Sequence, residues 1–159
     1  LVPGCGEIEL DVAEVQNAEQ ARKLLEQDKG KGYDGYLVLM LGLWTGAAQV
    51  IGSAGMPTLF VDDLYGGSGE FLIANAAARR NPKCKVACVS SSRVQDVADA
   101  ARCFAILKQG KTADDFVAAV AAVRKKATPP CGEMACKEDK VQADVGKALA
   151  AAKKMTLLK

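Results

Sequence analysis

The chain has 159 residues and none of them is histidine. Histidine is the commonest general base and metal ligand, and it is the usual partner of a nucleophilic serine or cysteine. Its absence excludes those nucleophile pairs. Any catalysis carried by this chain alone would have to use carboxylates, cysteine, lysine or tyrosine.

The sequence also lacks a strong net charge and a long apolar run. Twenty-one basic and 19 acidic residues leave a net charge of +2, so neither disorder nor a nucleic-acid-binding surface is indicated. No apolar run approaches the roughly 18 residues needed to span a bilayer, and no secretory signal pattern opens the chain. We therefore expect a soluble, cytoplasmic protein that binds neither nucleic acid nor membranes.

Five of the six cysteines divide into two groups. Cys84, Cys88 and Cys103 fall on strand or helix patterns, which favours small buried hydrophobic side chains. Cys131 and Cys136 lie in the least regular part of the chain, where free thiols, a local disulfide or a metal site remain open interpretations. A zinc site would lack two ligands, and the spacing of this pair does not favour a redox enzyme.

Hydrophobic periodicity predicts alternating strands and helices. The run at 36–41, YLVLML, is typical of a parallel strand buried on both faces. Helix starts are expected where Asn17, Ser92 and Thr112 can act as N-caps. Strands are expected over 6–12, 36–41, 58–61 and 86–90, and helices over 44–54, 69–80 and 140–154 and after each of the three caps.

This order predicts an α/β fold. We expect a doubly wound, flavodoxin-like or Rossmann-like, mostly parallel sheet of about four strands, with flanking helices and a helical C-terminal tail. The predicted division is an α/β ligand-facing domain over 1–110 and a helical extension over 111–159. The segment 155–159 resembles the start of another strand, which favours a longer polypeptide with a further domain.

The segment 60–71, FVDDLYGGSGEF, carries the strongest functional signal. Asp62 and Asp63 end a predicted strand, three glycines follow, and Glu70 opens the next helix. Ligands of open α/β sheets bind at the carboxyl ends of the strands, where carboxylates accept hydrogen bonds from sugar hydroxyls or bind a hard cation. The alternative is that the aspartates only cap the turn and Glu70 only complements the helix dipole.

Two further loops are expected at the same edge of the sheet. Trp44, the only tryptophan, follows one predicted strand and could stack on a sugar or belong to the core. Ser90 and Ser91 follow another, whereas Ser92 is assigned to the helix cap. The glycine loop matches no phosphate-binding motif, so a neutral polyol is favoured over a nucleotide. The candidate substrate-binding residues are Trp44, Asp62, Asp63, Tyr65, Gly66, Gly67, Ser68, Glu70, Ser90 and Ser91.

Residues 33–107 resemble the amino-terminal α/β region of L-fucose isomerase-like proteins. The resemblance is carried by DGYLV at 34–38, GLW at 42–44, GMPT at 55–58, VDDLYGGSGEF at 61–71 and VSSS at 89–92. It implies aldose–ketose interconversion with a divalent metal, usually manganese, held by acidic residues and a histidine that follow this region. Without a histidine in the chain, the resemblance extends only to the fold and a sugar-facing role.

Two functions are therefore expected from the sequence. The first is the substrate-facing domain of a sugar isomerase-like protein, inactive as an isolated chain, with no cofactor of its own and with manganese in a missing segment. Its catalytic residues are unknown and no metal ligand is assigned. The alternative is a non-catalytic flavodoxin-like binding or assembly module, whose alanine-rich helices form a homo-oligomer or contact another domain.

Overall fold

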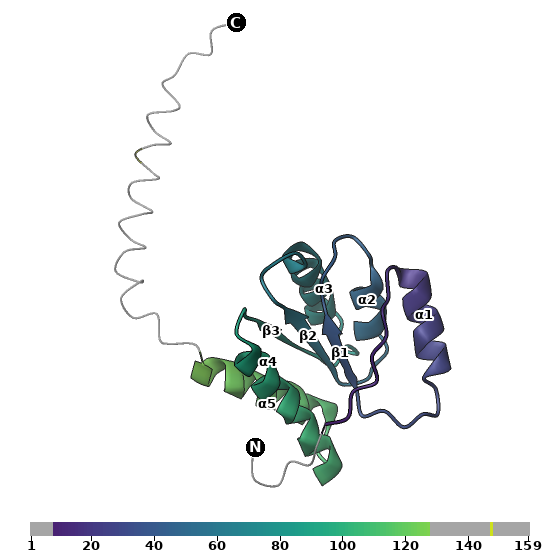
Figure 1. The fold of residues 1–159 in the computed structure, drawn as a ribbon. Coiled ribbons are helices and arrows are strands. Elements are labelled where there is room, and N and C mark those ends of the chain that lie inside the picture. Colours follow the sequence, from purple (N-terminus) through teal and green to yellow (C-terminus); the bar gives the residue numbers. More distant parts are fainter. Residues whose placement is uncertain (1–7, 128–146, 148–159) are drawn as a thin grey trace, which may run out of the picture. The chain divides into compact units, whose positions relative to one another are not determined.

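The computed structural model describes residues 8–127 and 147. Three parallel strands form its sheet in the order β1 (Tyr36–Leu39), β2 (Thr58–Asp62) and β3 (Val86–Ser90) (Figure 1). None of the helices in the described residues is long and apolar enough to cross a membrane. The helices are α1 (Ala18–Gln27), α2 (Ala47–Gly52), α3 (Ser68–Arg80), α4 (Val94–Ala101), the 3-10 helix η1 (Arg102–Gln109) and α5 (Ala113–Ala127). The predicted α/β class is confirmed.

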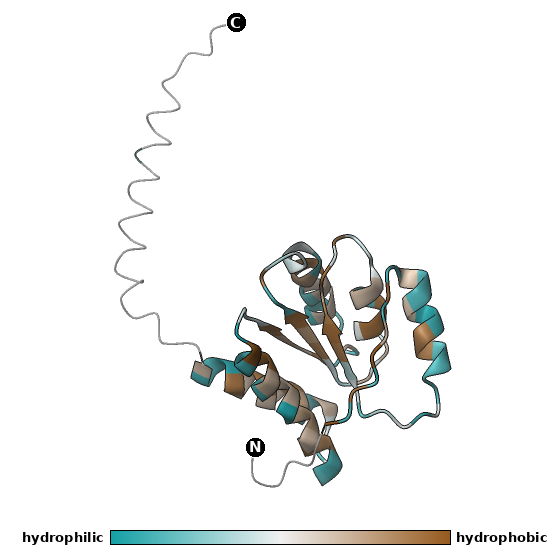
Figure 2. Cartoon of the chain, viewed as in Figure 1, coloured by the Kyte–Doolittle hydropathy of each residue, from teal (hydrophilic) through white to brown (hydrophobic). Residues whose placement is uncertain are grey.

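Helices cover both faces of the sheet. Side chains alternate along β2, so Leu59 and Val61 pack in one cluster with residues of α4, η1 and α5, including Phe116. Phe60 points the other way and packs with Phe71 and other residues of α3. Figure 2 shows the apolar strands between these two helical layers. Every residue of β2 is buried as a result.

The predicted strand over 6–12 is wrong for its described part, because residues 8–12 form no strand. Ile8, Leu10 and Val12 alternate with acidic residues as expected, but they are 40, 64 and 87% exposed. Alternation indicates which side chains would share a face, whereas strand formation also requires a partner edge. The described sheet therefore has three strands where about four were expected.

β1 is consequently an edge strand. Its apolar sequence predicts burial on both faces, but Leu39 is 48% exposed. Strand pairing ends at Leu39, before the predicted end at Leu41. The prediction of full burial is wrong here because only β2 lies beside β1 among the described strands.

Two of the three predicted helix caps are confirmed. The side chain of Asn17 accepts a hydrogen bond from the Gln20 amide at 2.9 Å. Thr112 and Asp115 form a reciprocal capping box, in which each side chain accepts from the other's amide. The Ser92 cap is wrong, because α4 starts after Arg93 and makes no side-chain cap bond. Of the helix predicted over 44–54, only α2 forms.

The prediction of buried cysteines is confirmed for Cys88 and Cys103. Cys84 is only half-buried. Cys131 and Cys136 lie outside the described residues. So do the strand-like segment 155–159 and all of the predicted helix 140–154 except residue 147.

Candidate functional site

The loops that follow the three strands lie at one edge of the sheet, which we call the rim. It consists of residues 40–46, 63–67 and 91–93. The parallel register pairs Leu39 with Val61 and Asp62 with Ser90, so the carboxyl ends of neighbouring strands lie side by side. The sequence prediction that these loops share one edge is confirmed.

Asp62 is a buried carboxylate that holds two parts of the rim together. It is 2% exposed and accepts from the Leu64 amide at 3.0 Å and from the hydroxyls of Ser68 and Ser90 at 2.9 Å each. These donors belong to the loop after β2, the start of α3 and the end of β3. Asp62 therefore fixes the glycine-containing loop against its neighbouring strand.

Glu70 performs the same task for the loop after β1. It is 4% exposed, and it accepts from the Thr45 amide at 2.8 Å, from the Gly46 amide at 3.0 Å and from the Thr45 hydroxyl at 3.1 Å. With its side-chain nitrogen turned inward, Gln49 also donates to Glu70 Oε1 at 3.1 Å and to the Gly46 carbonyl at 3.3 Å. The first turn of α3 is thus tied to the loop that carries Trp44.

Each of these two loops contains one bulky residue in the left-handed region. Trp44 has φ 61° and Leu64 has φ 65°, a conformation that is costly for such side chains. In each case a backbone amide at or directly after this position is bonded to a buried carboxylate. The Leu64 amide donates to Asp62, and the amide of Thr45, the residue after Trp44, donates to Glu70. The carboxylates therefore compensate the backbone strain.

The strained loops present large side chains outward. Trp44 is 79% exposed and Tyr65 is 96% exposed. Leu41, Leu43 and Leu64 are also more than half exposed. Aromatic and aliphatic surface thus lies next to the polar strand ends. Folding does not bury it, which is typical of a surface that contacts something else.

Gly67 has a packing role. A Cβ built on it would lie 1.8 Å from the Met40 carbonyl oxygen, so only glycine lets this loop approach the end of β1. Its φ is −95°, outside the left-handed region. In this loop Leu64 has the positive φ, and none of the three glycines has one.

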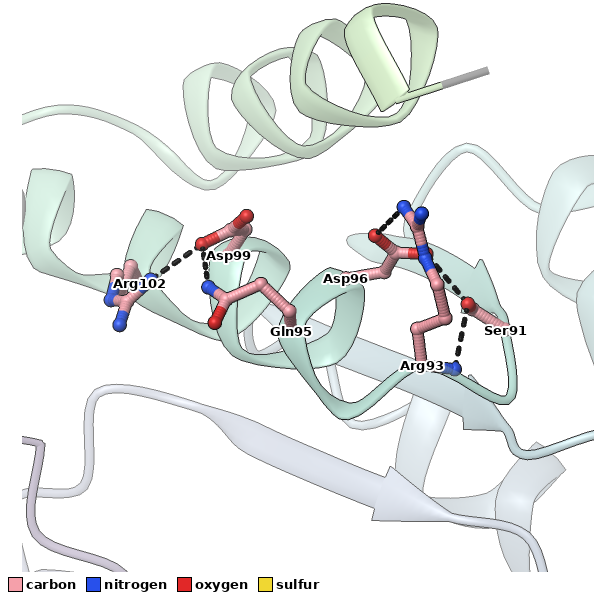
Figure 3. Close-up of polar contacts among 6 residues, drawn as sticks. All are labelled: Ser91, Arg93, Gln95, Asp96, Asp99 and Arg102. Carbon is pink, nitrogen blue, oxygen red and sulfur yellow. Dashed lines mark hydrogen bonds and ion pairs between the residues drawn. The ribbon is translucent and has the colours of Figure 1, made fainter. Parts of the chain in front are cut away.

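The third rim loop is organised by a charged network (Figure 3). The Ser91 hydroxyl donates to Asp96 at 2.6 Å, and Arg93 donates to the same carboxylate through Nη2 at 2.6 Å and Nε at 3.0 Å. The Arg93 amide donates to the Ser91 hydroxyl at 3.1 Å. Arg93, and to a smaller extent Ser91, lowers the pKa of Asp96 below its usual value.

The predicted site residues therefore separate into two groups. Asp62, Gly67 and Glu70 are buried and hold the loops, and Ser68 is half-buried and bonds to Asp62. The remaining candidates reach the surface and can contact a ligand directly. They are Trp44, Asp63, Tyr65, Gly66, Ser90 and Ser91.

Sequence reasoning missed the partners of Glu70 and the apolar part of the rim. Thr45, Gly46 and Gln49 lie 21 to 25 residues from Glu70, and no local spacing signals such a contact. The exposed leucines of the rim are Leu41, Leu43 and Leu64. Leu41 belongs to an apolar run that resembles core sequence, whereas Leu43 and Leu64 lie in the loops after strands. Only their positions after strand ends indicated that they are exposed.

The polarity of the rim limits its chemistry. The only basic residue in its three loops is Arg93, which is paired with Asp96. Asp62 and Glu70 have no ion-pair partner among the described residues, so their charges are balanced only by hydrogen-bond donors. No group of three or more His, Cys, Asp or Glu residues in the described ranges could hold a metal ion. The rim suits a neutral, hydroxyl-bearing ligand better than an anion.

Replacing Glu70 with glutamine tests its role in holding the rim. Glutamine keeps one acceptor oxygen and replaces the other with an NH2 group, which would face either the Thr45 amide or the Gly46 amide and leave that buried donor unsatisfied. We expect Glu70→Gln to lower the free energy of unfolding by about 2–3 kcal/mol in urea denaturation. The control Glu26→Gln changes an exposed side chain and should change it by less than about 0.5 kcal/mol. Equal effects of the two variants would contradict this role.

The network at Ser91 predicts a dependence of stability on pH. Because the folded-state pKa of Asp96 is lowered, its contribution is present above the usual value of 3.8 and is lost as pH falls through the lowered pKa. We expect Asp96→Asn to be less stable than the wild type at neutral pH, with the difference shrinking below pH 3.8. Thermal unfolding across this range measures it, and a difference that stays constant would refute the prediction.

No protein-family model, curated protein or solved structure matches this chain.

Proposed function

We propose that the rim contacts a carbohydrate as the substrate-facing part of a sugar isomerase-like protein. The observation that carries this proposal is the exposure of Trp44 and Tyr65 on loops fixed by buried carboxylates. A sugar has apolar C–H faces that an aromatic ring can cover and hydroxyls that need hydrogen-bond partners. The rim supplies both kinds of contact within adjacent loops.

The proposal gives the site residues different roles. Trp44 and Tyr65 cover the apolar face of the sugar, while Asp63, Ser90 and Ser91 accept hydrogen bonds from its hydroxyls. Asp62 and Glu70 do not contact the ligand, because they are buried and already bonded. They keep the loops in one conformation, which reduces the entropy lost on binding. Gly66, Gly67 and Ser68 shape the loop between them.

Charge favours an unphosphorylated sugar. Asp62, Asp63 and Glu70 lie within nine positions of one another, and none of them forms an ion pair among the described residues. Buried charges are screened less than exposed ones, so their repulsion of a phosphate persists in salt. The first amides of α3 can still donate to a neutral hydroxyl.

Catalysis belongs elsewhere in this proposal. The resemblance to L-fucose isomerase-like proteins assigns the manganese site to a region after the α/β part. The complete domain would be a doubly wound, flavodoxin-like sheet with a further strand, and another segment or subunit would supply the metal ligands. This chain would hold and orient the sugar without isomerising it.

The only tryptophan lies on the rim, so its fluorescence tests sugar binding directly. We expect aldopentoses or 6-deoxyhexoses to change Trp44 emission saturably, because the ring moves from water to a sugar face. Asp63→Ala should weaken binding about 10- to 150-fold, as expected for the loss of one hydrogen bond to a charged acceptor. The control Glu26→Ala removes an exposed carboxylate from α1 and should leave the affinity unchanged.

Amide hydrogen exchange provides a second test of sugar binding. Sugar binding should slow the exchange of amides in 62–70. If no sugar in the panel changes either the emission or this exchange, the carbohydrate role is refuted.

A second function is favoured by the leucines of the rim. Leu41, Leu43 and Leu64 are 66, 52 and 58% exposed, and with the two aromatic rings they form a large uncovered apolar surface. Leu41 and Leu43 contact the positions of Gly66 and Gly69, so the two loops are adjacent. Such a surface suits a non-catalytic assembly module in which the rim packs against another copy of the chain.

Sedimentation velocity distinguishes the second function from the first. If the rim is an interface, Leu41→Glu should dissociate an oligomer, because a charge would be buried without a partner. Leu72→Glu is the matched control, since Leu72 is 64% exposed on α3 outside the rim loops. A wild-type protein that stays monomeric at high concentration, or equal effects of the two variants, would reject assembly through the rim.

A further inference from the structure

A cavity of about 210 Å³ lies between α2 and α3, separate from the rim loops. Phe60 of β2 contributes to its apolar wall together with alanines of α3. Gln49 and Ser53 line the α2 side, and Asn81 and Cys84 line it beyond the end of α3. The proposed sugar contacts do not involve this space.

Small residues on both helices create the cavity. A Cβ on Gly52 would lie 2.7 Å from the Phe60 ring, so the absence of a side chain at Gly52 lets the ring pack against α2. Ala74, Ala77 and Ala78 face the cavity from α3. Larger residues at Ala74, Ala77 or Ala78 would extend into this space, which is partly open to solvent at the exposed residues Ser53, Ala77 and Asn81.

The size and lining of the cavity define a ligand class. Apolar cavities of about 150 Å³ accept a molecule the size of benzene, so this one has room for a six-membered ring with a substituent. None of its lining residues is charged, which favours a neutral molecule. Gln49, Ser53 and Asn81 provide hydrogen-bonding groups beside the apolar wall.

Gln49 connects this cavity to the rim. With its side-chain nitrogen turned inward, Gln49 donates to Glu70 and to the Gly46 carbonyl, and Glu70 in turn holds the loop that carries Trp44. A ligand that contacts the Gln49 amide would change the same hydrogen-bond network. Occupancy of the cavity can therefore alter the position of the indole ring.

We propose that the cavity between α2 and α3 binds a small neutral molecule, mainly apolar and about one ring in size with one hydrogen-bonding group, and that binding is coupled through Gln49 to the Trp44 loop. The site differs from the sugar-contacting rim in position and ligand chemistry. Binding at this site would regulate the affinity of the rim for its own ligand.

Cyclohexanol is a suitable probe, because it is neutral, ring-sized and does not absorb where tryptophan is excited. Alkylation of Cys84 in the native chain, read by peptide mass, reports whether the cavity is occupied. We expect cyclohexanol to slow this reaction saturably, by about tenfold at ten times its half-maximal concentration, and to raise the melting temperature. Trp44 emission should change over the same concentration range.

A variant that fills the cavity provides the matched comparison. Ala77→Phe should abolish the protection of Cys84 by cyclohexanol, whereas Ala76→Phe, exposed on the same helix and not lining the cavity, should retain it. Unchanged alkylation with a falling melting temperature would overturn the site. Protection without a change in Trp44 emission would overturn the coupling. Neither result depends on whether a sugar binds the rim, so failure of this site and failure of the proposed function are distinguishable.

Discussion

The rim depends on one physical constraint: two carboxylates are buried without an ion-pair partner among the described residues. Asp62 and Glu70 must satisfy their oxygens with hydrogen-bond donors, because an unpaired buried charge is very costly. The donors are amides and hydroxyls of the surrounding loops. Asp62 thus joins the loop that follows it to the end of β3, and Glu70 holds a loop that is remote from it in sequence.

The loops held by these carboxylates have two unfavourable features. Trp44 and Leu64 take left-handed backbone conformations, and large apolar side chains stay in water. Both features cost free energy, and both occur in the loops that the carboxylates hold. Both unfavourable features therefore occur on the surface for which we propose a binding role. The same surface accounts for both candidate functions, since a sugar and a protein partner each require preorganised aromatic area.

Glu70 also links the rim to the helical layer beneath it. Through Gln49, the hydrogen-bond network reaches the wall of the cavity between α2 and α3. Gly52 lets the Phe60 ring pack against α2 beside this cavity. A single network therefore connects two surfaces with different chemistry, one polar and aromatic, the other neutral and partly open to solvent. Through this network, a change in the position of the Gln49 side chain on α2 can change the conformation of the loop that carries Trp44.

Much of the fold and part of the site were predictable from sequence, because local patterns encode them. Apolar runs located all three strands, and Asn17 and Thr112 marked helix starts through caps that involve residues only three positions away. The chain order of strands and helices placed Asp62, Ser90 and Trp44 at one edge. The prediction that Ser92 caps a helix failed because Ser91 and Ser92 have equivalent local sequence. Only the hydrogen bond from Ser91 to Asp96 distinguishes them.

Tertiary structure decided the rest. Whether residues 8–12 pair with β1 depends on a contact that no local pattern specifies, and they do not pair. Whether Glu70 faces a ligand or the Thr45 amide depends on how α3 packs beside α2. The sequence by itself determined which residues gather at the rim, because parallel strands end at one edge. Packing determined which of them are buried, because burial and hydrogen bonding join residues that are distant along the chain.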